Sequence, residues 1–206
     1  GVASSVSNIG SVYFKQGDLV KALDYNARSL KIKEKIGNKK SISISLNNIG
    51  NILFEQGDYY RALDYYTRSL KIVEILGDKT TIANILNNIG NIFLKQGETA
   101  KAMDYFTKCL KSRKEIGNKK GIASSLNNIG AVYKNLGEFT KAIDYYIKSL
   151  KINEEIGNKS GISNSLNNIG SVYLKQGDLA KALECCTEAL IIAQELGFLE
   201  KIKVAS

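Results

Sequence analysis

The chain has 206 residues, of which 44% are hydrophobic and 24% charged, and its formal net charge is +9. It contains no histidine, and its three cysteines, Cys109, Cys185 and Cys186, have no CxxC spacing, so we expect no metal and no other cofactor. No apolar run approaches the roughly 20 residues of a membrane-spanning helix, so we expect no membrane insertion.

The first 40 residues define a unit that the rest of the chain repeats. Ser7-Asn8-Ile9-Gly10 is followed at 40-residue spacing by four copies of Asn-Asn-Ile-Gly, at 47–50, 87–90, 127–130 and 167–170. A fixed period indicates supersecondary units that bury their apolar faces only by stacking on one another. We therefore expect one array over 1–197, with repeats at 1–37, 38–77, 78–117, 118–157 and 158–197. Because residues 1–5 match residues 121–125, we interpret the chain as a fragment that begins inside a repeat.

Each repeat is predicted to begin with a helix, called helix A. In repeat 2, Ile42, Leu46 and Ile49 follow spacings of four and three, which places them on one apolar stripe. Gly57 then supplies a stop signal, and Asp58 is a candidate N-cap for the next helix. The same pattern predicts A helices near 2–16, 39–56, 79–96, 119–136 and 159–176.

The second half of each repeat is predicted to form helix B. In repeat 2, Ala62, Tyr66 and Ser69 share one side of this helix, and Gly77-Asp78 ends it and caps the next helix A. The predicted B helices lie near 18–36, 58–76, 98–116, 138–156 and 178–196. A glycine inside each helix A, such as Gly50, costs about 1 kcal/mol relative to alanine. We attribute it to a close crossing with helix B, where Ala62 and its equivalents offer a small surface.

This pattern resembles the tetratricopeptide repeat, in its longer form of 40 residues without proline. That form is similar to the arrays of spindle-orientation adaptors, kinesin light chains and bacterial sensor kinases. The resemblance implies an all-α fold, an α-solenoid of five antiparallel helix pairs wound into a right-handed superhelix. Residues 198–206 are predicted to start a divergent sixth repeat or capping helix. In repeat 2 the positions that carry the resemblance are Leu46, Ile49, Gly50, Leu53, Gly57, Ala62, Tyr66 and Ser69.

The resemblance also implies a concave inner face lined by the A helices. On a helical wheel, Asn47, Asn48 and Asn51 point away from the apolar stripe, towards that face. An amide side chain offers an acceptor and two donors, so it can pair with the backbone of an extended peptide. Two other interpretations stay open: the asparagines are tolerated polar residues, or they bond between adjacent A helices. The predicted peptide-binding residues are Asn47, Asn48, Asn51, Asn87, Asn88, Asn91, Asn127, Asn128, Asn167 and Asn168, with selectivity from Ile44, Phe54, Leu94, Lys95 and Lys175.

We therefore predict a scaffold that binds an extended or helical segment of a protein or peptide partner. The alternative is a structural array that self-associates through its ends. An enzyme is disfavoured because the sequence has no histidine, no phosphate-loop glycine pattern and no nucleophile beside a base. The excess positive charge lies at 31–40 and 108–120, including Lys33 and Arg113, and we interpret it as a solvated basic edge, not a nucleic-acid site. The odd cysteine count favours a reducing, cytoplasmic compartment.

Overall fold

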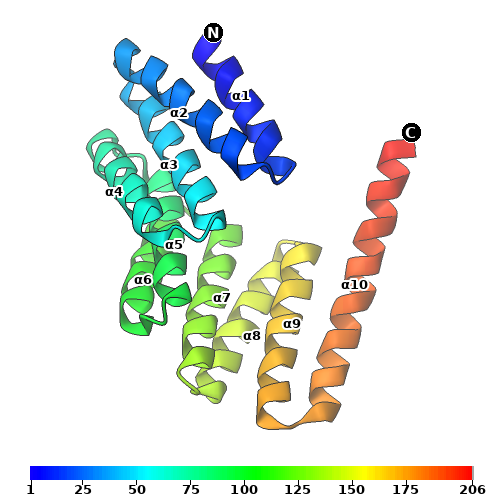
Figure 1. Cartoon of the computed structure of the whole chain (residues 1–206). Helices are drawn as coiled ribbons and strands as arrows, with labels where there is room; N and C mark the ends of the chain where they lie inside the picture. The colour runs from blue at the N-terminus through cyan, green and yellow to red at the C-terminus, as the bar shows by residue number, and fades with distance from the viewer. Residues whose placement is uncertain (206) are drawn as a thin grey trace. The chain divides into compact units, whose positions relative to one another are not determined.

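The computed structural model describes the backbone of residues 1–205 and the side chains of residues 1–197, and its regular structure over this range is α-helical (Figure 1). The chain divides into two compact units, the first from Gly1 to Gly97 and the second beginning at Glu98. We describe each unit separately. The predicted all-α class is confirmed.

Unit 1 contains five helices joined by short turns. They are α1 (Val2–Lys15), α2 (Leu19–Ile36), α3 (Lys39–Glu55), α4 (Tyr59–Leu76) and α5 (Lys79–Lys95). Each helix packs against the next one along the chain, and α3 also contacts α5. The A helices α1, α3 and α5 therefore alternate with the B helices α2 and α4, as the repeat pattern predicts.

Unit 2 contains the other five helices. They are α6 (Thr99–Glu115), α7 (Lys119–Asn135), α8 (Phe139–Glu155), α9 (Lys159–Gln176) and α10 (Leu179–Ala205). From α6 onwards each helix again packs against the next, and α7 contacts α9. The predicted boundaries of α1 to α9 agree with the structure to within one residue at each end.

The last helix departs from the prediction. A B helix ending near 196 was expected, but α10 continues to Ala205 and passes through Gly197, which does not adopt the positive φ of the turn glycines. The predicted sixth repeat or capping helix at 198–206 falls on residues whose side chains lie outside the described part of the chain. That assignment, and the single array over 1–197, stay predictions.

Local signals end the helices as expected. Gly57 and Gly77 adopt φ of 78° and 67°, which is the left-handed region that glycine tolerates. The Asp58 carboxylate accepts a hydrogen bond of 3.1 Å from the backbone N–H of Arg61, so it caps α4. Glu98, at the equivalent position before α6, makes no such bond. The longer glutamate side chain is therefore the weaker cap.

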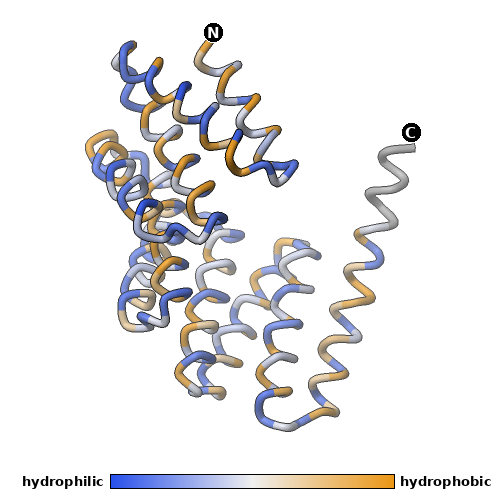
Figure 2. Tube along the Cα trace, in the orientation of Figure 1, coloured by the Kyte–Doolittle hydropathy of each residue, from blue (hydrophilic) through white to orange (hydrophobic). Residues whose placement is uncertain are grey.

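The core of each unit follows the apolar stripes of the A helices. Along each helix of Figure 2, apolar and polar segments alternate, and in α3 the side chains of Leu46, Ile49 and Leu53 are buried. The glycine inside helix A is required chiefly by the aromatic ring that packs against it from helix B, and less by the alanine that faces it. A Cβ added at Gly50 would lie 2.6 Å from Cε1 of the buried Tyr66. The predicted close crossing is present, but the aromatic side chain of helix B fills it.

Candidate functional site

The ten predicted asparagines lie on the A helices of both units. In unit 1 they belong to α3 and α5, and in unit 2 to α7 and α9. Nine are half-buried and Asn167 is exposed. They are therefore neither sealed in the core nor scattered, and each unit presents a polar face on neighbouring A helices.

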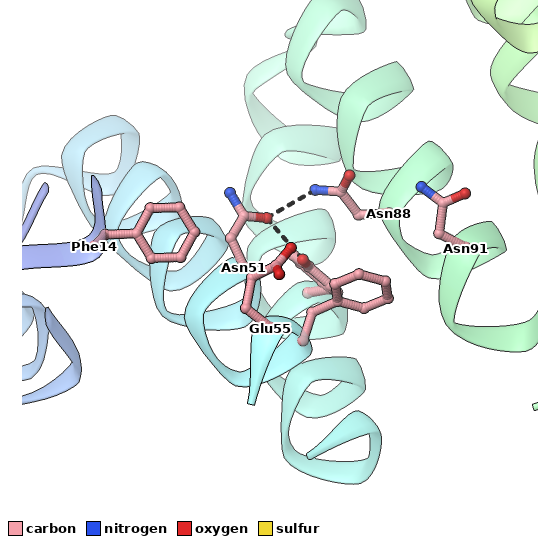
Figure 3. A pocket seen from close by; sticks show the side chains of 7 residues that line it. Phe14, Asn51, Glu55, Asn88 and Asn91 are labelled. Atoms are coloured by element: carbon pink, nitrogen blue, oxygen red, sulfur yellow. Dashed lines mark hydrogen bonds between the residues drawn. The ribbon is translucent and has the colours of Figure 1, made fainter. Parts of the chain in front are cut away.

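In unit 1 the asparagines bond to one another across two A helices. Asn88 Nδ2 on α5 donates to Asn51 Oδ1 on α3 over 3.0 Å (Figure 3). The same nitrogen donates to Asn47 Oδ1, also on α3, over 3.4 Å. The hydroxyl of Tyr66, on α4, donates to the same Asn51 oxygen over 2.7 Å. Burial, helped by the nearby carboxylate of Glu55, raises the pKa of Tyr66, so this hydroxyl keeps its proton. These contacts match the alternative in which the amides link adjacent A helices.

In unit 2 an asparagine and a serine link the two adjacent A helices. Asn127 Nδ2 on α7 lies 3.2 Å from Ser165 Oγ on α9, and the serine hydroxyl lies 3.4 Å from Asn127 Oδ1. The two groups can therefore donate in either direction. Polar side chains on the A helices thus stabilise the packing of neighbouring hairpins in both units.

These bonds leave part of each amide available in unit 1. Asn51 uses its oxygen twice, and within the described residues no hydrogen bond uses its two N–H groups. Asn88 uses its nitrogen, and its oxygen accepts from no described residue. Asn91 is half-buried and has no hydrogen bond within the described part of unit 1. Free donors and acceptors therefore stand side by side on α3 and α5.

The available groups line a cavity of about 330 Å³ in unit 1 (Figure 3). A second cavity of about 130 Å³ lies on the α1 side of α3 and shares Phe14 and Asn51 with the first. Together they hollow the face formed by α1, α3 and α5, which we call the A-helix face of unit 1. The larger cavity is lined by Phe14, Asn51, Phe54, Glu55, Tyr66, Asn88 and Asn91.

Sequence reasoning found only some of these residues. It predicted Asn51, Asn88 and Asn91 as ligand contacts and Phe54 as a selectivity neighbour, but it missed Phe14 and Glu55. Both lie near the C-terminal ends of A helices: Glu55 is four residues, about one helical turn, after Asn51, and Phe14 is three residues after Ser11, the equivalent of Asn51 in repeat 1. That placement was available from the same helical wheel. The hydroxyl of Tyr66 was also missed, because its side chain was considered only as core.

The predicted basic edge is wrong for two of its residues. Lys33 is buried, and its Nζ donates to Ser45 Oγ over 2.8 Å. Arg113 is also buried, and its Nη1 donates to the Gly121 carbonyl over 3.0 Å and to Ser125 Oγ over 2.8 Å. Desolvation lowers the pKa of Lys33. Both cations belong to packing between consecutive helices and cannot serve a polyanion.

The buried cysteine of unit 2 is poorly placed to react as a nucleophile. Cys109 is buried, with its Sγ 3.4 Å from Ser125 Oγ, and burial raises the pKa of this thiol, which opposes thiolate formation. Over the described residues, no group of three or more histidine, cysteine or acidic side chains is placed to hold a metal ion. Nor does any helix in that part of the chain combine the length and apolarity that crossing a bilayer requires.

Consecutive helical hairpins with a polar face on the A helices define a helical-repeat protein. The tetratricopeptide repeat family model matches residues 1–74, 41–115 and 121–195. The chain therefore belongs to the tetratricopeptide repeat family. No curated protein sequence matches it significantly.

Solved structures share the fold at low sequence identity. BtubC (BKLC) from P. vanneervenii is 22% identical with a TM-score of 0.80, and the match covers 94% of this chain and 80% of that one. A Rap protein complexed with competence and sporulation factor is 19% identical with a TM-score of 0.82, over 92% of this chain and 53% of that one. The nearly identical TPR-like repeats of a Podosopora anserina kinesin light chain are 12% identical with a TM-score of 0.76, and the match covers 94% of this chain and 95% of that one.

Proposed function

We propose that this protein is a non-catalytic scaffold that binds an extended segment of a protein partner on its A-helix faces. The observation that carries the proposal is the hollow face of unit 1, where asparagines held by their neighbours offer unused donors and acceptors. Its three free cysteines are consistent with a protein that acts in a reducing, cytoplasmic compartment.

The amides are already ordered before a partner arrives. Asn51 is fixed by hydrogen bonds from Tyr66 and Asn88, so little side-chain entropy remains to be lost when its N–H groups donate to a ligand carbonyl. An extended peptide backbone alternates carbonyl and N–H groups, which the Asn51 nitrogen and the Asn88 oxygen complement. The bonds between α3 and α5 therefore support the binding role and do not compete with it.

One structural neighbour is consistent with a binding role for this fold. The Rap protein with a similar fold was crystallised with competence and sporulation factor. At this level of identity the likeness concerns the fold alone, so the ligand of this chain has to be argued from its own residues. The predicted ten asparagines remain the proposed contacts, with Asn48 and Asn91 the best to test, since neither makes a hydrogen bond within the described residues.

The test uses a phage-displayed library of random dodecapeptides selected on the immobilised protein. Selected peptides are synthesised and their Kd is measured by calorimetry. Losing two hydrogen bonds of about 1 kcal/mol each should weaken binding by roughly 30-fold in the double variant Asn48→Ala, Asn91→Ala. Thr67→Ala, an exposed position on α4, is the matched control and should bind like the wild type. If the double variant keeps full affinity, the A-helix face is not the binding surface.

End-to-end self-association is the second candidate, favoured by the exposed faces of α1 and α10. In α1, Ile9 is 42% exposed and Val12 53%, whereas their equivalents Ile49 and Ile52 in α3 are at most 2% exposed. On α10, Leu183 is 70% exposed. Sedimentation velocity across a concentration series tests this candidate. A mass that rises with concentration, and falls in Val12→Asp, would support it, and a monomer at every concentration would exclude it.

A further inference from the structure

The larger cavity of unit 1 contains one acidic side chain at a position where the other repeats carry none. Glu55 is the last residue of α3, and its equivalents in the other four repeats are three lysines and an asparagine. Many carboxylates of the chain are ion-paired, such as Asp18 with Lys21 at 2.9 Å. Glu55 forms no ion pair within the described residues. Repeat 2 therefore presents an uncompensated negative charge on the A-helix face.

No lysine or arginine lines this cavity among the described residues. Lys15, a basic member of the face, lines the smaller cavity on the other side of α3. The carboxylate of Glu55 also acts across the cavity, because together with burial it raises the pKa of the Tyr66 hydroxyl. An anionic ligand would be repelled here, and a cationic one would be attracted.

Two phenylalanine rings line the cavity together with this carboxylate, one from α1 and one from α3 itself. Phe14, labelled in Figure 3, belongs to α1, and Phe54 belongs to α3; both are half-buried. The Phe54 ring is supported by Tyr59, with ring centroids 5.6 Å apart. Aromatic faces attract cations, and they also pack against the methylene groups of long basic side chains. The chain uses this contact elsewhere, since Lys21 Nζ lies 5.1 Å from the ring centroid of a tyrosine.

Asparagine side chains supply the other hydrogen-bond acceptors of the cavity besides Glu55. In Figure 3, Asn51, Asn88 and Asn91 follow one another from α3 to α5, with Glu55 close to Asn51, and all four residues line the cavity. Asn88 Oδ1 and the amide of Asn91 make no hydrogen bond within the described residues, so both can accept from a ligand. A planar guanidinium has five donors and stacks on aromatic faces, which suits this set better than a compact ammonium does. A cavity of about 330 Å³ falls in the size range of ligand sites.

We propose that this cavity receives the side chain of an arginine from the bound protein segment, with its guanidinium between Glu55 and the asparagine oxygens and its methylene stem on the phenylalanine rings. This inference rests on the proposed peptide-binding function and adds the chemistry of one position in the ligand. Repeat 2 thus selects a basic residue, while asparagines outside this cavity, such as Asn48, hold the neighbouring backbone.

The experiment titrates ¹⁵N-labelled protein with Nα-acetyl-arginine amide and follows the side-chain NH₂ signals of Asn51, Asn88 and Asn91 by NMR. Nα-acetyl-glutamine amide is the neutral control probe. Saturable shifts are expected with the arginine probe and none with the glutamine probe. Loss of the charge-assisted hydrogen bond in Glu55→Gln should raise the Kd by about 10-fold. Glu74→Gln, which removes an exposed carboxylate of α4, should leave the Kd unchanged.

Equal shifts with the two probes, or an unchanged Kd in Glu55→Gln, would overturn the inference. Its failure can be separated from that of the proposed function by the selected dodecapeptides. If these peptides depend on Asn48 and Asn91 but contain no arginine and ignore Glu55→Gln, the face binds peptides and the arginine cavity is wrong. If the arginine probe binds as expected and no peptide is selected, the cavity stands and the peptide-binding scaffold is wrong.

Discussion

Equivalent tyrosines in repeats 2 and 4 have opposite hydrogen-bonding states. Tyr66 and Tyr146 are both fully buried, and each ring fills the space beside the glycine of its helix A. Tyr66 donates to Asn51 Oδ1 over 2.7 Å. In repeat 4 the equivalent of Asn51 is Ala131, and no described residue accepts a hydrogen bond from the Tyr146 hydroxyl. Replacing tyrosine by phenylalanine therefore removes a hydrogen bond in one repeat and an unsatisfied hydroxyl in the other.

The two substitutions should change the free energy of unfolding in opposite directions. Tyr66→Phe loses one hydrogen bond and should destabilise the protein by about 1 kcal/mol. A buried hydroxyl without a partner costs roughly 1–3 kcal/mol, and the small void left by its removal offsets part of that gain. We expect Tyr146→Phe to leave stability unchanged or raise it by about 1 kcal/mol. The difference between the two variants should then be about 1–2 kcal/mol.

Native-state hydrogen exchange assigns this stability difference to α4 and α8, because it gives local opening free energies for the backbone amides of these helices. Urea denaturation followed by circular dichroism gives the global value. A third variant, Ala131→Asn, supplies the missing acceptor at a helix-propensity cost of about 0.5 kcal/mol. In that background Tyr146→Phe should become destabilising, with a coupling of about 1 kcal/mol in the double-mutant cycle. Equal losses for Tyr66→Phe and Tyr146→Phe would refute the reasoning.

Two further stability predictions follow from the packing of the helices. Gly130→Ala should destabilise the protein by about 1–2 kcal/mol in thermal or urea unfolding, because the new Cβ would lie 2.7 Å from the buried ring of Tyr146. Gly170→Ala should cost less than Gly130→Ala, because its Cβ would meet the movable Sγ of the exposed Cys186 at 2.9 Å and the Ala182 carbonyl only at 3.3 Å. Burial holds the pKa of Lys33 in the folded protein below its ordinary value of 10.5. Between the folded pKa and 10.5 the unfolded chain binds more protons than the folded protein does, so the free energy of unfolding should rise with pH. Urea midpoints measured from pH 7 to 10.5 should show this rise relative to Lys33→Met, and parallel curves would contradict it.

The sequence predicted the helices well because their ends are set by local signals. Gly57 and Asp58 lie next to each other, and together they end α3 and start α4 through their own conformations and hydrogen bonds. The asparagine contacts are different in kind. Asn88 and Asn47 are 41 residues apart, and whether their amides meet depends on the stagger between two hairpins. The repeat pattern gives the face on which an asparagine lies, and tertiary packing decides its partner.

The buried cations show a second way in which sequence reasoning failed. Lys33 and Arg113 were grouped with their neighbours by charge, although the helical period places Lys33 four residues after the buried Ser29. A helical wheel of α2 therefore places Lys33 on the buried side, which the clustering of charge along the sequence does not reveal. The cavity of unit 1 was harder to foresee, because it depends on how far the rings of Phe14 and Phe54 stand apart across two helices.

Buried polar pairs also differ from one repeat to the next, so they favour one stacking order of the hairpins. Lys33 on α2 donates to Ser45 on the next helix A, and the buried residues at these two positions one repeat later are Val73 and Ile85. A hairpin stacked on the wrong neighbour would place the Lys33 ammonium against a branched alkyl side chain and leave a charged donor buried without a partner. That cost exceeds the stabilisation from burying one more alkyl group, so near-identical repeats can still stack in one order. The same order brings Glu55 and Asn91 to one cavity, which none of the repeats could form alone.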